Sequence, residues 1–319
     1  MRFAVLGAGS LGLLVAGYLA KAGNQVVVVG KPEQVATIKD KGLEVVAPTS
    51  FKVVVDTASQ PDKVGSADYL LVVVKARDTA AALERVAGVE FGGVASLQNG
   101  MLKDGQLADM FGWPKVIGAT TILGATLLEP GRTQHTLFGA TYFGEFDGSR
   151  SERVERLAAA FNEAGMKAEI PKNILSAEWS KLCQIVPAAL LSAASRLEYY
   201  KVCKSRDLAE LFVNITHECV AVAKACGVEV ADYQGFAIKS LAEAPFEQAV
   251  GMLLERGANL ERSGQTNVRI SMLQDIMKGR KTEIEATAGF VVQRAREHGI
   301  SVPNVEFGYR LIRGVESYL

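Results

Sequence analysis

The strongest chemical pattern is a set of three glycines near the N-terminus. The apolar segment 3–6 precedes the glycines, and a segment with helical periodicity follows them. The glycines therefore join a strand to a helix. In such a loop the glycines permit a tight turn, close approach of a pyrophosphate and close packing of the helix, whose N-terminus faces the phosphates. We therefore expect a dinucleotide to bind here. The residues of the loop are Gly7, Ala8, Gly9, Ser10, Leu11 and Gly12.

The end of the second strand bears on which dinucleotide binds. Proteins that bind NAD place an Asp or Glu there to accept the ribose hydroxyls. Here the strand 25–29 is followed by Gly30 and Lys31, with no carboxylate at the strand end. Lys31 favours a 2′-phosphate and hence NADP(H), although Glu33 is close enough in sequence to meet a hydroxyl instead.

A second lysine follows a later apolar run. Lys75 comes directly after residues 69–74, which read as a strand buried on both faces. A charge at the carboxyl end of such a strand points into the ligand crevice of a parallel sheet. On this pattern alone, a lysine that simply ends a strand at the surface is equally compatible.

The elements that would position these residues change halfway along the chain. Up to about residue 146, short β-branched runs alternate with segments of helical periodicity. We expect a hairpin in 43–56 and edge strands in 133–146. From residue 151 onward nearly all segments have helical periodicity. We predict an α/β chain: a Rossmann-like, doubly wound parallel sheet in residues 1–168 and an all-helical second domain in residues 169–319.

Composition limits the partners. Thirty-five basic and 35 acidic residues balance, so there is no basic footprint for nucleic acid. No apolar run suits a membrane helix, and the three histidines do not assemble into a metal site. The four cysteines have neither disulfide nor zinc spacing, which favours reduced thiols in a cytoplasmic protein. The apolar second domain is compatible with a homodimer.

Several further stretches resemble the ketopantoate reductases (2-dehydropantoate 2-reductases), in the family's order and over nearly the whole chain. Besides the glycine loop they are Val74–Ala76, Gln98–Met101, Ala177–Leu182, Ser271–Ile276, Thr282–Ile284 and Arg294–Pro303. The family reduces the ketone of a branched 2-oxo acid with NADPH, so the resemblance implies this activity.

The resemblance also implies roles for individual residues. Lys181 matches the family's catalytic lysine, and Glu283 matches the acid that contacts the substrate hydroxyl and supports activity. Asn99 matches an asparagine of the substrate site, and Ser271 matches the serine that holds the substrate carboxylate. Lys75 matches a lysine that contacts the cofactor, and Asn99 and Glu283 are also expected beside it. From its sequence alone, Ser271 would also suit a helix N-cap.

One departure concerns the substrate. The family has asparagines four and eight residues after its lysine, where this chain has Ile185 and Ala189. Gln184 is expected to replace the first of these partly, and Pro187 to disturb the helix. Three hypotheses follow: a ketopantoate reductase, a reductase of another branched or more apolar 2-oxo acid, and an NADP(H)-binding sensor without turnover.

Overall fold

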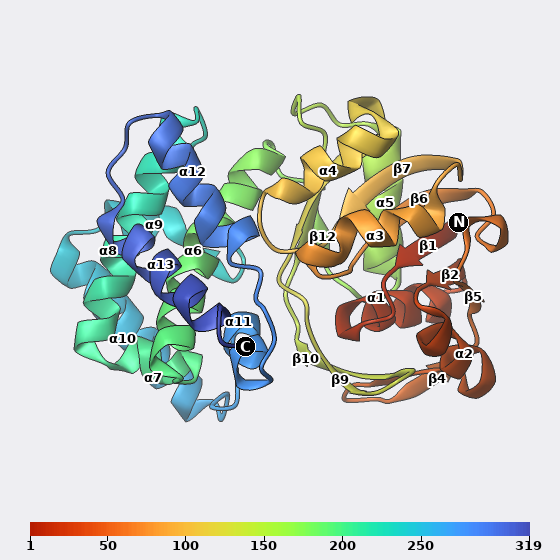
Figure 1. The fold of residues 1–319 in the computed structure, drawn as a ribbon, viewed down its shortest axis with the longest axis horizontal. Coiled ribbons are helices and arrows are strands. Elements are labelled where there is room, and N and C mark those ends of the chain that lie inside the picture. Colours follow the sequence, from red (N-terminus) through yellow and green to blue (C-terminus); the bar gives the residue numbers. More distant parts are fainter. The chain divides into compact units, whose positions relative to one another are not determined.

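The computed structural model describes residues 1–319 and divides into two compact units. The first comprises residues 1–98 and 102–175, and the second comprises residues 99–101 and 176–319. Figure 1 shows strands and helices mixed in the red-to-yellow part of the chain and helices almost alone in the green-to-blue part. The predicted α/β first half and helical second half are confirmed.

The first unit is built on an eight-stranded sheet of order β12-β11-β8-β7-β6-β1-β2-β5. From β8 to β5 all neighbours are parallel, while β11 runs antiparallel to β8. The order reverses between β1 and β6, which is where doubly wound sheets bind their ligands. The strands are β1 (Arg2–Leu6), β2 (Gln25–Val29), β5 (Asp56–Ala58), β6 (Ala67–Val72), β7 (Phe91–Ser96), β8 (Val116–Thr121), β11 (Thr141–Gly144) and β12 (Ala168–Glu169).

Helices cover both faces of this sheet. Buried side chains of α1 and α5 pack on one face and those of α3 and α4 on the other, because successive strand residues point to opposite sides. Because helices cover both faces of the sheet, side chains on both faces are buried, which explains why the strands are almost continuously apolar. The helices are α1 (Ser10–Lys21), α2 (Pro32–Lys41), α3 (Thr79–Leu83), α4 (Leu102–Phe111) and α5 (Glu152–Glu163), with short 3₁₀ turns η1 (Pro61–Lys63), η2 (Ala76–Asp78), η3 (Glu84–Val86) and η4 (Trp113–Lys115).

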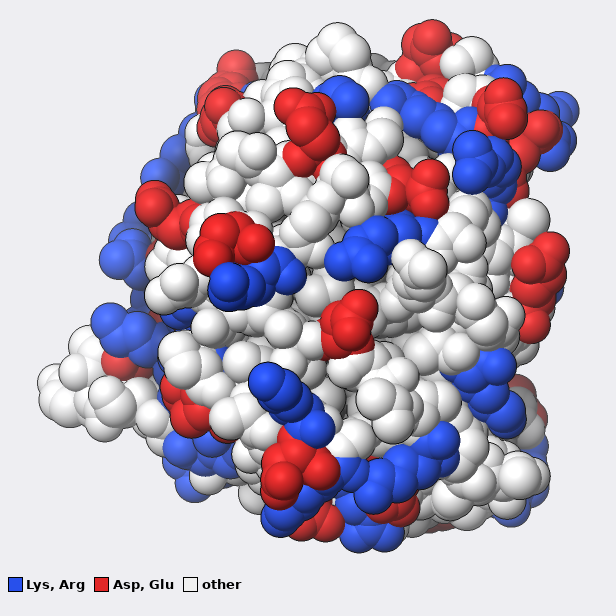
Figure 2. All heavy atoms as spheres, turned by 90° about the vertical axis from the view of Figure 1, so that its right-hand side faces the viewer, with Lys and Arg blue, Asp and Glu red and all other residues white.

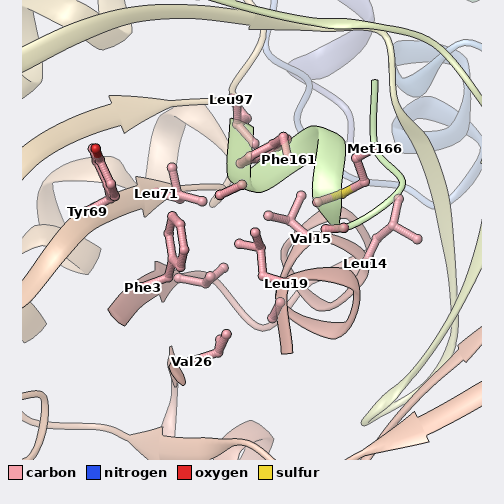
Figure 3. Close-up of a cluster of buried hydrophobic side chains, with 14 of the residues drawn as sticks. Phe3, Leu14, Val15, Leu19, Val26, Tyr69, Leu71, Leu97, Phe161 and Met166 are labelled. Carbon is pink, nitrogen blue, oxygen red and sulfur yellow. The ribbon is translucent and has the colours of Figure 1, made fainter. Parts of the chain in front are cut away.

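One of the two cores fixes the glycine loop in place. Figure 3 shows Phe3 of β1 and Leu71 of β6 with Leu14, Val15 and Leu19 of α1 in one buried cluster. Phe3 and these three α1 side chains have no exposed surface. Burying each such side chain stabilises the fold by about 1.5–3 kcal/mol, so the strand and helix on either side of the loop are held firmly.

The edge segments form a second, four-stranded sheet. The predicted hairpin in 43–56 is confirmed as β3 (Leu43–Val46) and β4 (Phe51–Val53), which pair antiparallel. The expected edge strands contribute β10 (Arg132–Leu137), which pairs with β3 and with β9 (Gly124–Glu129).

The second unit is helical apart from one hairpin, β13 (Asp232–Tyr233) with β14 (Phe236–Ala237). A π-helical turn, η5 (Glu285–Gly289), precedes α12. The α-helices are α6 (Ile174–Ser195), which begins at the end of the first unit, α7 (Tyr199–Lys204), α8 (Arg206–Ala225), α9 (Ile238–Glu243), α10 (Phe246–Arg262), α11 (Ser271–Met277), α12 (Phe290–Glu297) and α13 (Pro303–Glu316).

One expectation for these helices was wrong. The short helix expected at 248–251 is in fact the 17-residue α10, because buried contacts with α7 and α8 carry the helix past its glycines. Pro187 lies inside α6 without ending it. The buried side chains around Pro187, including Val186 and Leu190, hold the helix together despite the missing hydrogen bond.

Surface charge is mixed in sign. Figure 2 shows lysine and arginine interspersed with aspartate and glutamate over the face it displays, without a broad field of one sign. None of the helices combines the length and the hydropathy needed to cross a membrane.

Candidate active site

The glycine loop has the shape that a pyrophosphate requires. A Cβ on Gly12 would lie 1.9 Å from the carbonyl oxygen of Gly7, so only glycine lets α1 approach the loop this closely. A Cβ on Gly9 would meet nothing within 4 Å, which leaves open space above the loop. Gly9 caps α1 without a side-chain hydrogen bond, and the first turn carries no acid. The helix N-terminus is therefore suited to an anion.

Two lysines lie near this loop in the fold of the first unit. Lys31 is exposed at the N-cap of α2, directly beyond β2, and Glu33 is exposed in the first turn of that helix. Lys75 follows β6, the strand across the switch point from the glycine loop, and is half-buried. The positions of both lysines suit cofactor contacts in a doubly wound sheet.

Residues 99–101 belong to the second unit, and only a glycine at position 100 lets this segment pack closely against η5. This glycine has φ +88°, and a Cβ there would lie 2.1 Å from the carbonyl oxygen of Ala286. The next residue, Met101, donates its backbone N–H to the same oxygen over 3.3 Å. Any larger residue at position 100 would push the segment off η5.

Asn99 of this segment binds the predicted catalytic lysine. The Lys181 ammonium donates a hydrogen bond of 2.9 Å to Oδ1 of Asn99. Lys181 is half-buried on α6, and the residues after it, Leu182 and Cys183, are buried. The amide oxygen of Asn99 thus orients an ammonium that comes from a helix with an otherwise apolar, buried surface around it.

Asn99 also lines a pocket within the second unit, together with Ser271 and Glu283. Three residues predicted separately thus meet at one place, with Lys181 joined to it through Asn99. The cavity measures about 10 Å³, roughly the room of one water molecule, so a 2-oxo acid enters only if side chains move. Its lining is Asn99, Ile185, Ala189, Ser271, Met272, Asp275, Glu283 and Thr287.

Ile185 and Ala189 both line the pocket, at the positions where the family has asparagines. Ala189 is almost completely buried and Ile185 is half-buried. One wall of the pocket is therefore apolar and cannot donate or accept a hydrogen bond.

Three further lining residues were not predicted from the sequence. Met272 and Asp275 lie on α11 with Ser271, and Asp275 is buried although it carries a carboxyl group. Thr287 lies in η5 and donates its hydroxyl to the Glu283 carbonyl over 3.0 Å. Asp275 lies four residues after Ser271, and Thr287 lies four residues after Glu283. Because residues four apart share a helix face, this spacing could have indicated that both line the pocket.

Two sequence interpretations of this region need correction. Gln184 does not line the pocket; its amide donates to the Tyr199 hydroxyl over 3.0 Å and accepts from Arg256 over 3.3 Å, beside a different cavity. Ser271 is the first residue of α11, not its N-cap, and the cap residue Ile270 makes no side-chain hydrogen bond. The Ser271 side chain is therefore not used as a cap.

The cysteines lie outside this pocket. All four are free thiols. Burial raises the pKa of Cys183 and of Cys219, and it raises the pKa of Cys203 to about 11 despite the nearby Arg256 charge. Thiols with such pKa values are poor nucleophiles at neutral pH.

A doubly wound sheet with a glycine loop that suits a pyrophosphate, followed by a helical unit in which a lysine bonds a residue of a pocket, is typical of pyridine-nucleotide-dependent oxidoreductases. Comparison with known families makes this specific. Residues 3–148 match the model of the ketopantoate reductase PanE/ApbA family, and residues 173–316 match the C-terminal model of the same family. The chain therefore belongs to the ketopantoate reductase PanE/ApbA family.

Relatives match over their full length. The 2-dehydropantoate 2-reductase of Archaeoglobus fulgidus is 32% identical over 320 residues, which cover 100% of this chain and 99% of the relative. That of Halobacterium salinarum is 32% identical over 318 residues, which cover 98% of both chains.

Solved structures have the same fold. The 2-dehydropantoate 2-reductase of Geobacter metallireducens GS-15 has a TM-score of 0.85 at 26% identity, covering 98% of this chain and 99% of its own. A D-mandelate dehydrogenase in complex with NADH and anilino(oxo)acetate has a TM-score of 0.86 at 19% identity, covering 100% and 99%. The latter likeness concerns the fold alone.

Proposed function

We propose that this protein reduces 2-dehydropantoate (ketopantoate) to pantoate with NADPH, residues 1–168 binding the cofactor and residues 169–319, with Asn99, carrying the reaction. The observation that supports it best is the hydrogen bond between Lys181 and Asn99 beside a pocket that also contains Ser271 and Glu283. Full-length relatives that bear the name 2-dehydropantoate 2-reductase support the same substrate.

Bound NADPH supplies a hydride to the carbonyl carbon of the 2-oxo acid. Negative charge then develops on the carbonyl oxygen, and Lys181 stabilises it and donates the proton that completes the hydroxyl. Asn99 holds the ammonium through its amide oxygen. This fixes the direction of the proton donor before the substrate arrives.

The other pocket residues bind the substrate. Ser271 donates its hydroxyl to the substrate carboxylate. Glu283 contacts the hydroxyl of the product and counters the charge of Lys181.

The proposal that NADPH is the cofactor is supported by residues after β1 and after β6, on both sides of the point where the strand order reverses. The open space over Gly9 and the uncapped start of α1 suit the pyrophosphate, together with Ala8, Ser10 and Leu11 of the same loop. Exposed Lys31 suits a 2′-phosphate, and Lys75 suits a cofactor contact after β6.

Replacement of Lys31 by alanine is expected to narrow the preference for NADPH over NADH by about tenfold, measured as the ratio of kcat/KM values. Equal use of both cofactors by the unchanged protein contradicts this interpretation.

A panel of 2-oxo acids tests the substrate. With NADPH in excess, ketopantoate is expected to give the highest kcat/KM among ketopantoate, 2-oxoisovalerate, 2-oxoisocaproate and phenylpyruvate. Ketopantoate carries a hydroxyl that the other three lack, so the comparison isolates the polar part of the pocket. If ketopantoate reacts no faster than the others, its assignment is wrong and the general 2-oxo acid reductase stands.

A second substrate class has an observation in its favour. Ile185 and Ala189 make one pocket wall apolar, which suits a more apolar branched 2-oxo acid. The panel separates this hypothesis, because 2-oxoisocaproate would then exceed ketopantoate. Tight NADPH binding with no turnover of any member would instead favour a non-catalytic sensor.

We also propose that the protein works in the cytoplasm as a homodimer. Free thiols in three buried positions suit a reducing compartment. Light scattering of the purified protein tests the dimer, since the chain mass is 34.1 kDa.

A further inference from the structure

A second cavity in the helical unit is larger than the catalytic pocket. It measures about 340 Å³, which is within the usual range of about 300–1,000 Å³ for small-molecule sites. It shares no lining residue with the catalytic pocket. Its lining is Gln184, Tyr233, Gly235, Phe236, Ala237, Leu241, Met252, Leu253 and Arg256.

Arg256 is the only charged residue in this lining. Its guanidinium donates to the carbonyl oxygen of Gly235 over 2.8 Å and to the side-chain oxygen of Gln184 over 3.3 Å, and both acceptors are neutral. The guanidinium also lies over the ring of Tyr199, with 5.8 Å to the ring centroid. Many other arginines of this chain pair with carboxylates, such as Arg153 with Glu145 and Arg206 with Glu247.

The geometry leaves part of the guanidinium for a ligand. A guanidinium carries five N–H donors in a planar fork, and the two neutral acceptors engage two of them. The fork matches a carboxylate, which accepts two parallel hydrogen bonds. The ring of buried Tyr199 lies against the guanidinium, so this contact and the two hydrogen bonds limit the orientations of the arginine.

The rest of the wall selects what is attached to that carboxylate. Phe236, Leu241 and Leu253 are buried apolar side chains, with Met252 half-buried beside them. The wall contains no carboxylate and no second cation. One positive charge in an apolar wall favours a singly charged ligand with an apolar body over a phosphate, whose two charges would stay partly unpaired.

We propose that this Arg256 cavity is a binding site for a small monocarboxylate with an apolar body, separate from the catalytic pocket. Arg256 binds the carboxylate, and the apolar side chains of β14, α9 and α10 enclose the rest of the molecule. The site is independent of the reaction proposed above and exists whether or not ketopantoate is the substrate.

Titration calorimetry with 3-phenylpropanoate tests the site, with 3-phenylpropanamide as the neutral control of equal size. The acid is expected to bind at least about tenfold more tightly than the amide, because only the carboxylate makes charge-assisted hydrogen bonds to the guanidinium. Equal binding of acid and amide, or no binding of the acid, overturns the proposal.

Three variants locate the binding. Arg256→Met keeps the apolar stem that packs beside Tyr199 and removes the charge, so it should weaken acid binding at least about tenfold. Ala237→Phe fills the cavity mouth from an exposed position on β14 and should weaken binding equally, which keeps the test valid if Arg256→Met fails to fold. Ser271→Ala alters the catalytic pocket only and should change binding less than twofold.

Two other results would contradict the assignment. Loss of binding in Ser271→Ala with binding kept in Arg256→Met means that the probe occupies the catalytic pocket. Conversion of a dimer to a monomer by Arg256→Met, seen by light scattering without any ligand, means that the cavity is a contact between two copies of the chain.

Discussion

The two cavities of the helical unit both use helix α6, but they differ in the partners of their cations. Lys181 is held by the amide oxygen of Asn99, beside a pocket that contains the acids Asp275 and Glu283. Arg256 meets neutral acceptors in a wider and largely apolar cavity. A cation that can lose its proton, placed near carboxylates, is equipped for proton transfer, whereas a guanidinium among neutral groups can only bind.

The largest effect that this contrast predicts is the loss of Lys181. Lys181→Ala should lower kcat by about 10³-fold or more, because it removes both the proton donor and the charge that stabilises the developing oxyanion. NADPH affinity, measured by fluorescence titration, should change little. Lys224→Ala, at an exposed position on α8, is the matched control. Comparable turnover in the two variants would remove the distinction between a reacting and a binding cation.

Gly100→Ala should have the next largest effect. The added Cβ would lie 2.1 Å from the Ala286 carbonyl oxygen, so the segment must shift and Asn99 with it. A misplacement of about 1 Å near the reacting groups can lower kcat about 10²-fold. In contrast, Gly105→Ala in α4 introduces a Cβ that meets nothing within 4 Å, and should leave kcat unchanged. An unimpaired Gly100→Ala enzyme would mean that Asn99 does not position Lys181.

A change in the apolar wall of the pocket should have a smaller effect than the two substitutions above, and it should alter the substrate preference. Ile185→Asn introduces an amide into the apolar wall of the catalytic pocket, where it can bond the hydroxyl of ketopantoate. The ratio of kcat/KM for ketopantoate over 2-oxoisocaproate should rise about tenfold. Ile300→Asn is the matched control, since Ile300 is half-buried like Ile185 but does not line the pocket. A ratio that does not change would show that this wall does not contact the substrate.

The smallest effect concerns the scaffold of the Arg256 cavity. Tyr199→Phe removes the hydroxyl that accepts a hydrogen bond from Gln184, and should lower the free energy of unfolding by about 1 kcal/mol. The loss is measured by urea denaturation. Burial raises the pKa of the Tyr199 hydroxyl, with the charge of Arg256 opposing the shift, so the hydroxyl stays protonated at neutral pH. An unchanged midpoint would mean that this hydrogen bond adds no net stability.

The nucleotide-binding unit could be predicted from its sequence because its signals are local. The glycine loop, the strand before it and the helix after it lie within about twenty consecutive residues, and the apolar strands show that both faces of the sheet are covered. The rules for parallel connections limit the possible strand orders, but no single residue specifies the observed one. What the sequence did not reveal was the length of the segments with weak patterns, such as α10.

The candidate active-site pocket was harder to predict because its residues come from distant parts of the chain. Lys181 and Asn99 are separated by 82 positions, and no periodicity connects them. Family resemblance named both residues, but helical spacing misled for Gln184. At about 100° per residue, Gln184 lies about 60° to one side of Lys181 and Ile185 about 40° to the other, which directs them to different cavities. Buried Asp275 carried no signal of its own beyond its spacing from Ser271.

The grouping of residues 99–101 with the helical unit has a consequence for how this protein can be taken apart. The second unit is not one continuous stretch of the gene, because Asn99, which bonds Lys181, is encoded inside the first half. A chimera that exchanges residues 176–319 between two relatives would combine the lysine of one parent with the asparagine loop of the other. Recombination at the obvious boundary therefore tests the fit between Gly100 and the Ala286 carbonyl oxygen, and only parents that share this contact should yield active hybrids.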